Sequence, residues 1–423
     1  MMKTLIRNVS VFDGNSPRLL ENADILIQDN LVTEIAEGQS DAGVFDQVID
    51  GKGLTAIPGL IDCHIHMSCT MPTAWNDRMR LDEVAVRSVR FAHEMLLRGF
   101  TTVRDAGGVT YGLKTSIDQG YIDGPRIYPS NAYLSQTCGH GDLRTNRAEG
   151  RDPNGTYPSP AIRIGMGVLC DGVPEVLKAA REQLYLGATQ IKIMAGGGLS
   201  SLLDHLWTVQ FTEDEMRAAV QAAADFGTYV MAHLYTPEAM QRAVRAGVKS
   251  FEHGTLMDEE TARMIADNGI WVCPCPQFGR PGGGPPKGVV PKVPIEFMID
   301  SENRETELIN RFDLPIIFGT DATGLPEHVE EVQLDDLHYF KKRFGSLKGL
   351  RAVTGNAGRV LSMCTHQNPY WQGKVGVLEK GAFADLLLID GNPVDDLDVL
   401  RDKNNMKLIM KDGRIYKNTM GTD

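Results

Sequence analysis

The chain has 423 residues, of which 42% are hydrophobic and 44 are glycine, and its formal net charge is −12 at pH 7. This composition is typical of a well-buried, turn-rich globular protein and shows no sign of disorder. The acidic charge argues against nucleic acid or an anionic membrane as a partner. No apolar run is long enough for a membrane span or a signal peptide, and the seven cysteines include no C-x-x-C pair. We therefore expect a soluble cytoplasmic protein with reduced thiols.

The two ends of the chain share one pattern, which is short strands joined by tight turns. At the amino end the pattern covers residues 4–13, 24–36 and 47–59, and at the carboxyl end it covers 375–393 and 407–418, with Asp412-Gly413 as a hairpin turn. Neither end is long enough to bury a core alone. We therefore expect residues 1–57 and 369–423 to form one composite β-sandwich domain, with residues 58–368 as an inserted unit.

The inserted unit repeats a glycine or similar break, a short β-branched run and a helix-like stretch. Helical periodicity is clear at residues 80–98 and 212–226, and Thr212 and Glu215 predict a capping box. The eight β runs are 56–66, 99–108, 124–135, 187–198, 227–235, 247–254, 269–276 and 314–324. Eight alternating units favour an α/β fold of the (β/α)8 TIM-barrel class, in which chemistry gathers at the carboxyl ends of the strands.

Chemically distinctive residues occur near the ends of these runs. The first run ends in His64 and His66, which are two positions apart and so face the same way in a strand. The others are Lys192, His233, His253 and Asp321. Zinc favours imidazole and carboxylate ligands, and a buried ammonium such as that of Lys192 is costly unless it is paired or modified. By contrast, Cys273 and Cys275 in "VCPCP" have a spacing that favours packing of the wall over metal binding.

Six segments together resemble the amidohydrolase superfamily over essentially the whole chain: "PGLIDCHIH", "IKIMAGGG", "MAHLY", "FEHG", "FGTDA" and "GVLEKGAFADLLLID". In binuclear members of that superfamily the lysine is carboxylated by carbon dioxide and becomes a bridging anion. The resemblance thus implies two Zn²⁺ ions bridged by carboxylated Lys192 and a hydroxide. The implied ligands are His64, His66 and Asp321 for the inner ion, and His233 and His253 for the outer one.

Such a centre is suited to hydrolysis of an amide or related C–N bond. Two divalent ions lower the pKa of a bridging water and polarise the substrate carbonyl. Asp321 can then take the proton of the attacking hydroxide and deliver it to the leaving nitrogen.

Within the superfamily the chain looks most like the metal-dependent carboxypeptidase and dipeptidase branch, which includes prolidase-like, imidazolonepropionase-like and ochratoxinase-like enzymes. The resemblance implies that His140 in "TCGHGD" contacts the terminal carboxylate of the substrate, and that Tyr235 in "AHLYTPE" polarises the scissile carbonyl. Arg144, Arg147 and Arg280 lie in elaborate loops and are further candidates to bind a carboxylate.

We therefore expect a hydrolase of a peptide or N-acyl amino acid bond next to a free carboxylate, with L-Xaa-L-Pro-type dipeptides as the leading small-molecule substrates. The resemblance also implies a homo-oligomer. One alternative is a hydrolase of xenobiotic amide, urea or carbamate bonds, of the ochratoxin type. Another is a mononuclear deaminase or cyclic-amidine hydrolase, which has no need of Lys192, and a third is a metal-free scaffold protein.

Overall fold

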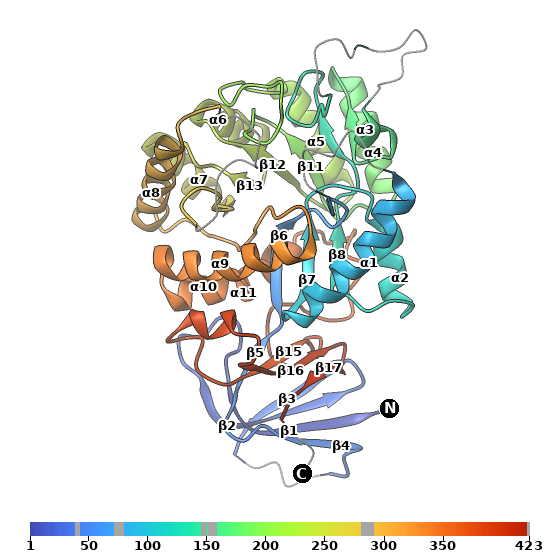
Figure 1. Cartoon of the computed structure of the whole chain (residues 1–423), viewed down its shortest axis with the longest axis vertical. Helices are drawn as coiled ribbons and strands as arrows, with labels where there is room; N and C mark the ends of the chain where they lie inside the picture. The colour runs from blue at the N-terminus through green and yellow to red at the C-terminus, as the bar shows by residue number, and fades with distance from the viewer. Residues whose placement is uncertain (39–42, 72–79, 145–149, 151–158, 281–291, 421–423) are drawn as a thin grey trace.

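The computed structural model describes residues 1–38, 43–71, 80–144, 150, 159–280 and 292–420. A mixed β-sheet contains strands from both ends of the chain, and the remainder is a larger α/β part in which helices surround parallel strands (Figure 1). In the described residues, no helix is both long and apolar enough to span a bilayer.

The mixed sheet joins the two ends of the chain. Its strand order is β17-β16-β15-β5-β1-β2-β3, and β4 also pairs with β1. Antiparallel pairing of β5 with β15 brings the amino-terminal and carboxyl-terminal strands together. The strands are β1 (Lys3–Val11), β2 (Leu20–Gln28), β3 (Leu31–Glu37), β4 (Gln47–Asp50), β5 (Thr55–Pro58), β15 (Leu386–Ile389), β16 (Met406–Lys411) and β17 (Arg414–Asn418).

The predicted pairing of the two ends is confirmed, but the eight strands form one connected sheet rather than two separate ones. One edge of β1 pairs with β4 and then with β5, which keeps the sheet continuous. Alternate residues from both ends, such as Ile6, Ile25, Leu386 and Leu408, are fully buried in a single cluster, so the sheet wraps around its own core. The proposed domain limits at residues 57 and 369 remain a prediction.

The α/β part is of the TIM-barrel type, as expected, and its strands run parallel. One sheet has the order β6 (Leu60–Ile65), β7 (Phe100–Asp105) and β8 (Arg126–Pro129). The second has the order β10 (Gly167–Leu169), β9 (Tyr133–Ser135), β11 (Ile191–Met194), β12 (Val230–Leu234), β13 (Ser250–His253) and β14 (Trp271–Cys273). Isolated parallel bridges join Val272 to Ile316 and Ile65 to Ala322.

The prediction of eight regular strands is wrong in three details. The third run is divided into β8 and β9 by Asn131, whose φ of 53° is incompatible with a continuous strand. Strand β10 has only three residues, which is too short to give a period-two signal. The eighth run, residues 314–324, forms the isolated bridges instead of a regular strand, and Asp321 has a φ of 50° within it.

Helices follow most of these strands. Helix α5 begins with the predicted capping box, in which the Glu215 N–H donates to Thr212 Oγ1 and the Thr212 N–H donates to the Glu215 carboxylate. The helices are α1 (Leu81–Leu97), α2 (Tyr111–Asp118), α3 (Pro160–Arg163), α4 (Val173–Tyr185), α5 (Glu213–Asp225), α6 (Pro237–Ala246), α7 (Glu259–Asn268), α8 (Ile295–Arg311), α9 (Pro326–Phe344), α10 (Ser346–Ala352), α11 (Gly355–Leu361) and the 3₁₀ helix η2 (Leu397–Arg401).

The largest apolar cluster fills the space between strands and helices, with buried residues such as Phe91 on α1, Ile193 on β11 and Ala232 on β12. Because these parallel strands are held side by side by that core, their carboxyl ends open onto one rim. This arrangement positions the site described next.

Candidate active site

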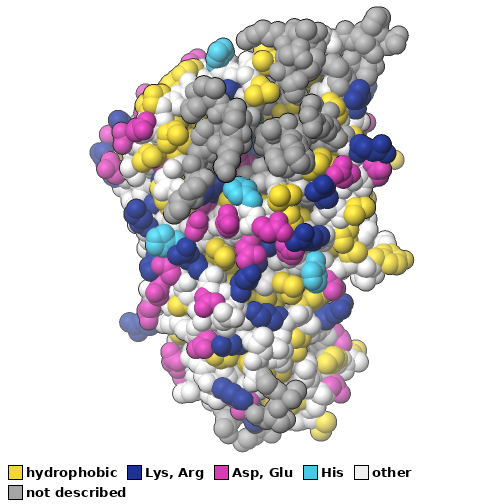
Figure 2. All heavy atoms as spheres, viewed as in Figure 1, with side chains coloured by type: hydrophobic (Ala, Val, Ile, Leu, Met, Phe, Trp, Pro, Cys, Tyr) yellow, Lys and Arg dark blue, Asp and Glu magenta, His cyan; other side chains and the backbone are white. Residues whose placement is uncertain are grey.

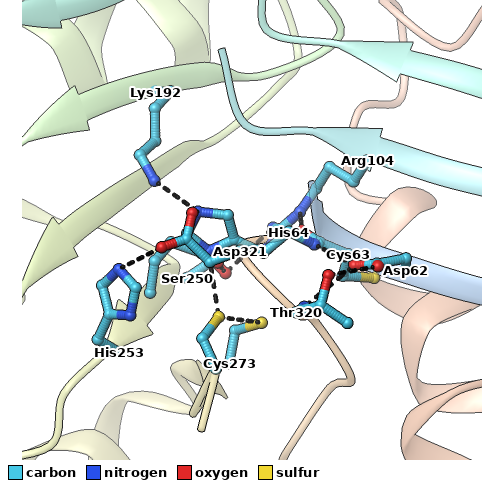
Figure 3. Close-up of polar contacts among 12 residues, drawn as sticks. Asp62, Cys63, His64, Arg104, Lys192, Ser250, His253, Cys273, Thr320 and Asp321 are labelled. Carbon is cyan, nitrogen blue, oxygen red and sulfur yellow. Dashed lines mark hydrogen bonds and ion pairs between the residues drawn. The ribbon is translucent and has the colours of Figure 1, made fainter. Parts of the chain in front are cut away.

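Four of the sequence-predicted ligands, His64, Lys192, His253 and Asp321, lie close together in the structure (Figure 3). Asp321 Oδ1 lies 3.4 Å from His64 Nε2 and 3.3 Å from His66 Nε2. Lys192 Nζ lies 3.3 Å from His64 Nε2, and His253 Nε2 lies 3.9 Å from Asp321 Oδ2. Residues separated by up to 257 positions thus converge on one point from β6, β11, β13 and the segment after residue 314.

His233 on β12 joins the same group. Its ring centroid lies 4.8 Å from that of His253 and 4.0 Å from that of His140, on which it stacks. The two imidazoles proposed for the outer ion are therefore neighbours, with His140 directly beside them.

The chemistry and spacing of these groups fit a divalent metal centre. Donor atoms around one tetrahedral Zn²⁺, with bonds of about 2.0–2.2 Å, lie about 3.3 Å apart. The distances from Asp321 Oδ1 to the two histidine nitrogens match that spacing. His253 has both ring nitrogens buried and without a hydrogen-bond partner among the described residues, and a bound ion would satisfy one of them.

The other hydrogen bonds of the imidazoles orient nitrogen lone pairs toward the site. His66 Nδ1 lies 2.8 Å from the Gly107 carbonyl, and His233 Nε2 lies 3.4 Å from the Gly197 carbonyl. A nitrogen that bonds to a carbonyl must carry the proton, so in the neutral ring the other nitrogen is left as a ligand.

Glu252 lies at ion-pair distance from the opposite nitrogen of His64, although its Oε2 accepts no hydrogen bond within the described residues. Its Oε2 lies 2.9 Å from His64 Nδ1, while its Oε1 accepts hydrogen bonds from Arg104 at 2.7 Å and from Ser250 at 2.6 Å. Glu252 and Arg104 are both fully buried. The sequence analysis missed this pair. The signal that could have revealed it is a charged residue inside each of the buried runs "SFEHG" and "TTVRD".

The two cysteines of "VCPCP" lie behind His64, on the side of the ring that faces Glu252. Their sulfur atoms are 3.5 Å apart, and Cys275 Sγ is 3.3 Å from His64 Nδ1. Burial raises the pKa of Cys275 to about 12 and that of Cys273 well above its ordinary value. With His64 and Glu252 the two sulfur atoms also form a compact group of potential metal ligands, so the packing role expected for the cysteines stays a prediction.

Left-handed backbone conformations are concentrated at the site. The φ angles of His253, Cys275 and Asp321 are 74°, 46° and 50°, in a region that residues other than glycine rarely adopt. Such conformations are costly and persist where the surrounding structure holds them, frequently at functional sites.

Burial and neighbouring charges shift the pKa of several ionisable groups here. Burial lowers the pKa of Lys192 and lowers that of His253 to about 4. It likewise places the pKa values of His64 and His233 well below normal. Burial acts to raise the pKa of Asp321, but the neighbouring imidazoles outweigh it and keep that pKa below its ordinary value. Burial acts to lower the pKa of His66, but the hydrogen bond and charge of Asp321 outweigh it and hold that pKa above its ordinary value. The site therefore combines a carboxylate with imidazoles whose pKa values are shifted in both directions.

A cavity of about 190 Å³ opens beside these groups. His64, His66, Lys192, His233 and Asp321 line one part of it, and Tyr133, Met166 and Met194 are among the apolar residues that line another. Gln277, which the sequence analysis did not single out, also lines the cavity and donates from Nε2 to Asp321 Oδ2 at 2.8 Å.

The predicted substrate-binding residues fall into two groups, those that line this cavity and those that do not. His140 and Arg280 line it. In the described part of the chain, Tyr235 and Arg144 are not among the lining residues. Tyr235 is buried and stacks on His253 at a centroid distance of 4.8 Å. Arg147 lies outside the described residues.

The two arginines have different partners. Arg280 Nη1 donates to both carboxylate oxygens of buried Asp336 at 3.0 Å. Burial raises the pKa of Asp336 to about 8, although Arg280 opposes the shift. Arg144 pairs with Asp142 in the same loop, with Nε 2.8 Å from Oδ1. On the face of the molecule shown in Figure 2, acidic and basic side chains are interspersed and form no basic stripe.

Comparison with known proteins identifies the family. The amidohydrolase family profile matches residues 55–416 of this chain. Ochratoxinase from Aspergillus niger is 30% identical over 94% of this chain and 83% of its own. A crystal structure of a prolidase complexed with N-methylphosphonate-L-proline is 33% identical, with a TM-score of 0.88 over 99% of this chain and 100% of the other. A structure of a Xaa-Pro dipeptidase with bound methionine is 27% identical, with a TM-score of 0.81 over 98% and 100%.

The chain therefore belongs to the amidohydrolase family. It is a hydrolase that acts on C–N bonds. Members of this superfamily typically use divalent metals, in agreement with the cluster of potential ligands.

Proposed function

We propose that the protein hydrolyses an amide bond next to a free carboxylate, with L-Xaa-L-Pro-type dipeptides as its leading substrates. The observation that carries the proposal is the cavity itself, in which the cluster of metal-type ligands and the cationic side chain of Arg280 line one small space. A substrate could thus present its scissile bond to the ligand cluster while its carboxylate meets the guanidinium.

In this proposal two divalent ions, for which zinc is the leading candidate, occupy the ligand cluster. His64, His66 and Asp321 hold one ion, and His233 with His253 hold the other. When bound, such ions acidify water and polarise the carbonyl of the substrate. Asp321 holds the proton removed from water and passes it to the leaving nitrogen. Its bond from Gln277 fixes Oδ2 and leaves Oδ1 facing the histidines.

Lys192, once carboxylated, would supply an anionic ligand to the two ions. Its side chain is buried, and within the described residues His64 is its sole hydrogen-bonding neighbour. A buried ammonium without a carboxylate partner is unfavourable, whereas the neutral amine reacts with carbon dioxide to give an anion between the two groups of ligands. A mononuclear deaminase would give no role to this lysine.

Arg280 and His140 bind the carboxylate of the substrate, and Tyr235 polarises the scissile carbonyl. Arg280 is supported by its position in the cavity and by Asp336, which holds the guanidinium in place. Arg144 is the weaker candidate because, within the described residues, it does not line the cavity. For Tyr235, stacking on His253 fixes the ring next to a proposed metal ligand.

The ochratoxinase relative favours a second candidate, the hydrolysis of a xenobiotic amide. The two candidates can be separated by assaying the zinc-loaded protein against a dipeptide library and against aryl amides with and without a free carboxylate. We expect L-Xaa-L-Pro dipeptides to be cleaved fastest and each substrate to lose activity when its carboxylate is blocked. Cleavage of aryl amides alone would favour the second candidate, and indifference to the carboxylate would refute the proposed recognition.

A further inference from the structure

The ring of His140 is closely packed. It stacks on His233 at a centroid distance of 4.0 Å with an interplanar angle of 8°. It also lies against Gly198, where an added Cβ would be 2.1 Å from the imidazole. Only glycine leaves room for the ring at this position, so the loop after β11 is shaped around His140.

Hydrogen bonds also fix the orientation of the His140 ring. His140 Nδ1 lies 2.9 Å from Ser201 Oγ and 3.4 Å from Asp204 Oδ2. The backbone N–H of His140 donates to Gln210 Oε1 at 2.8 Å. With Nδ1 donating to these groups, Nε2 is the ring nitrogen left for a substrate in the cavity that His140 lines, and it donates to a carboxylate when the ring is an imidazolium.

Asp204 is held in turn by Lys292. The Asp204 side chain is 1% exposed, and its Oδ1 lies 2.9 Å from Lys292 Nζ. It also accepts hydrogen bonds from the Gly198 N–H at 2.9 Å and from the Ser201 hydroxyl. A buried carboxylate with this many donors has one preferred orientation and stays charged.

Lys292 also forms hydrogen bonds with the backbone of the loop of residues 198–204. Its ammonium donates to the carbonyl oxygens of Gly198 at 2.8 Å and of Asp204 at 2.6 Å. One lysine, placed just before α8, therefore closes the loop of residues 198–204 over His140. The sequence separation of 88 residues between Lys292 and Asp204 explains why no local pattern revealed the contact.

We propose that Asp204 and Lys292 are positioning residues that hold His140 for recognition of the substrate carboxylate. The inference rests on the proposed function, because it assumes a substrate with a free carboxylate. Its physical basis is that an imidazole with a carboxylate at one nitrogen has a fixed orientation at the other. The network therefore acts on substrate binding rather than on the step that breaks the bond.

The test compares Asp204→Asn, Lys292→Met and Lys292→Arg with the wild type. Each zinc-loaded protein is assayed with alanyl-proline and with its carboxyl-terminal amide, and bound zinc is measured. For Asp204→Asn we expect KM for the free acid to rise about 10- to 100-fold, as for other residues that orient a functional histidine. We expect kcat for the free acid, the low residual kcat/KM for the amide and the zinc content to stay near wild type. Lys292→Met should show the same rise in KM for the free acid. Lys292→Arg should have a KM for the free acid close to that of the wild type.

Asp385→Asn is the matched control. Asp385 is also a buried carboxylate paired with a cation, Arg126, but it lies beside β15 and does not line the cavity. We expect this variant to lose stability with no change in KM for either compound. A general loss of packing would then be distinguished from loss of the His140 orientation.

Equal effects of Asp204→Asn on the acid and on the amide would overturn the inference, as would a wild-type KM for the acid. If the wild-type protein cleaves neither compound, the proposed function fails, and a crystal structure of Asp204→Asn decides the positioning role. The inference expects the His140 ring to leave Ser201 in that variant. A ring in its wild-type orientation would refute it.

Discussion

Replacement of Glu252 by glutamine tests how the buried charges support the site. Glu252 carries the only carboxylate that the structure describes within hydrogen-bond distance of the Arg104 guanidinium, and both side chains are 0% exposed. Glutamine keeps the shape but removes the negative charge, which leaves the arginine charge uncompensated. Breaking a buried pair in this way costs about 3 to 5 kcal/mol, and we expect the lower end because the glutamine oxygen can still accept from Arg104.

The same change also alters His64. The Glu252 Oε2 atom 2.9 Å from His64 Nδ1 would become an amide NH2, which is a donor. His64 Nδ1 must then accept a hydrogen bond, so the ring proton moves to Nε2, the nitrogen that faces Asp321. A protonated Nε2 cannot bind a metal ion. We therefore expect metal affinity to fall about 10- to 100-fold, the usual effect of losing a residue that orients a metal-binding histidine.

Urea unfolding of the metal-free protein measures the first effect, and competition with a chelating dye measures the second. Glu305→Gln is the control, because Glu305 is equally buried but has no hydrogen-bond partner on either oxygen in the described structure. Burial raises the pKa of Glu305 well above its ordinary value, and glutamine keeps the shape of this side chain. We expect this control to stay within about 1 kcal/mol of wild type. Wild-type metal affinity in Glu252→Gln, or equal destabilisation of the two variants, would refute the reasoning.

Three further predictions concern the metal centre and pH. Lys192→Ala should lower kcat/KM more than about 100-fold, with partial recovery in small carboxylic acids, and full activity would refute the bridging role. Chelation should remove about two ions per chain by elemental analysis and lower the thermal midpoint, since saturated binding at 1,000 times Kd contributes about 4 kcal/mol per ion. Burial acts to raise the pKa of Asp204, but His140 holds that pKa below its ordinary value. Stability from this group is therefore present above about pH 4 and lost as pH falls further, and acid unfolding of Asp204→Asn should lack this loss.

Much of the candidate site could be predicted from sequence because its residue types stand at recognisable positions in local sequence patterns. A polar residue at the end of each β run is visible without any structure, and parallel strands bring those ends together. His64, Lys192 and His253 were singled out on that basis. The class of fold followed from the same repetition.

The groups that orient these residues could not be predicted in the same way. Whether an arginine such as Arg280 or Arg144 faces the cavity depends on which acidic partner the folded chain places beside it. The division between β8 and β9 and the missing regularity after residue 314 are also tertiary effects. There, the backbone adopts left-handed conformations at Asn131 and Asp321 that propensity alone opposes.

The sequence by itself determined the class of fold, the pairing of the two chain ends and the residues able to bind metal, because each depends on residue type and short-range periodicity. Only the tertiary structure decided which nitrogen of each imidazole faces the cavity and which carboxylate holds it. Those choices depend on contacts such as Glu252 with Arg104 and Asp204 with Lys292, whose partners are separated by 148 and 88 residues. A buried charge must find an opposite charge or hydrogen bonds wherever the fold supplies them, and that location is a property of the whole chain.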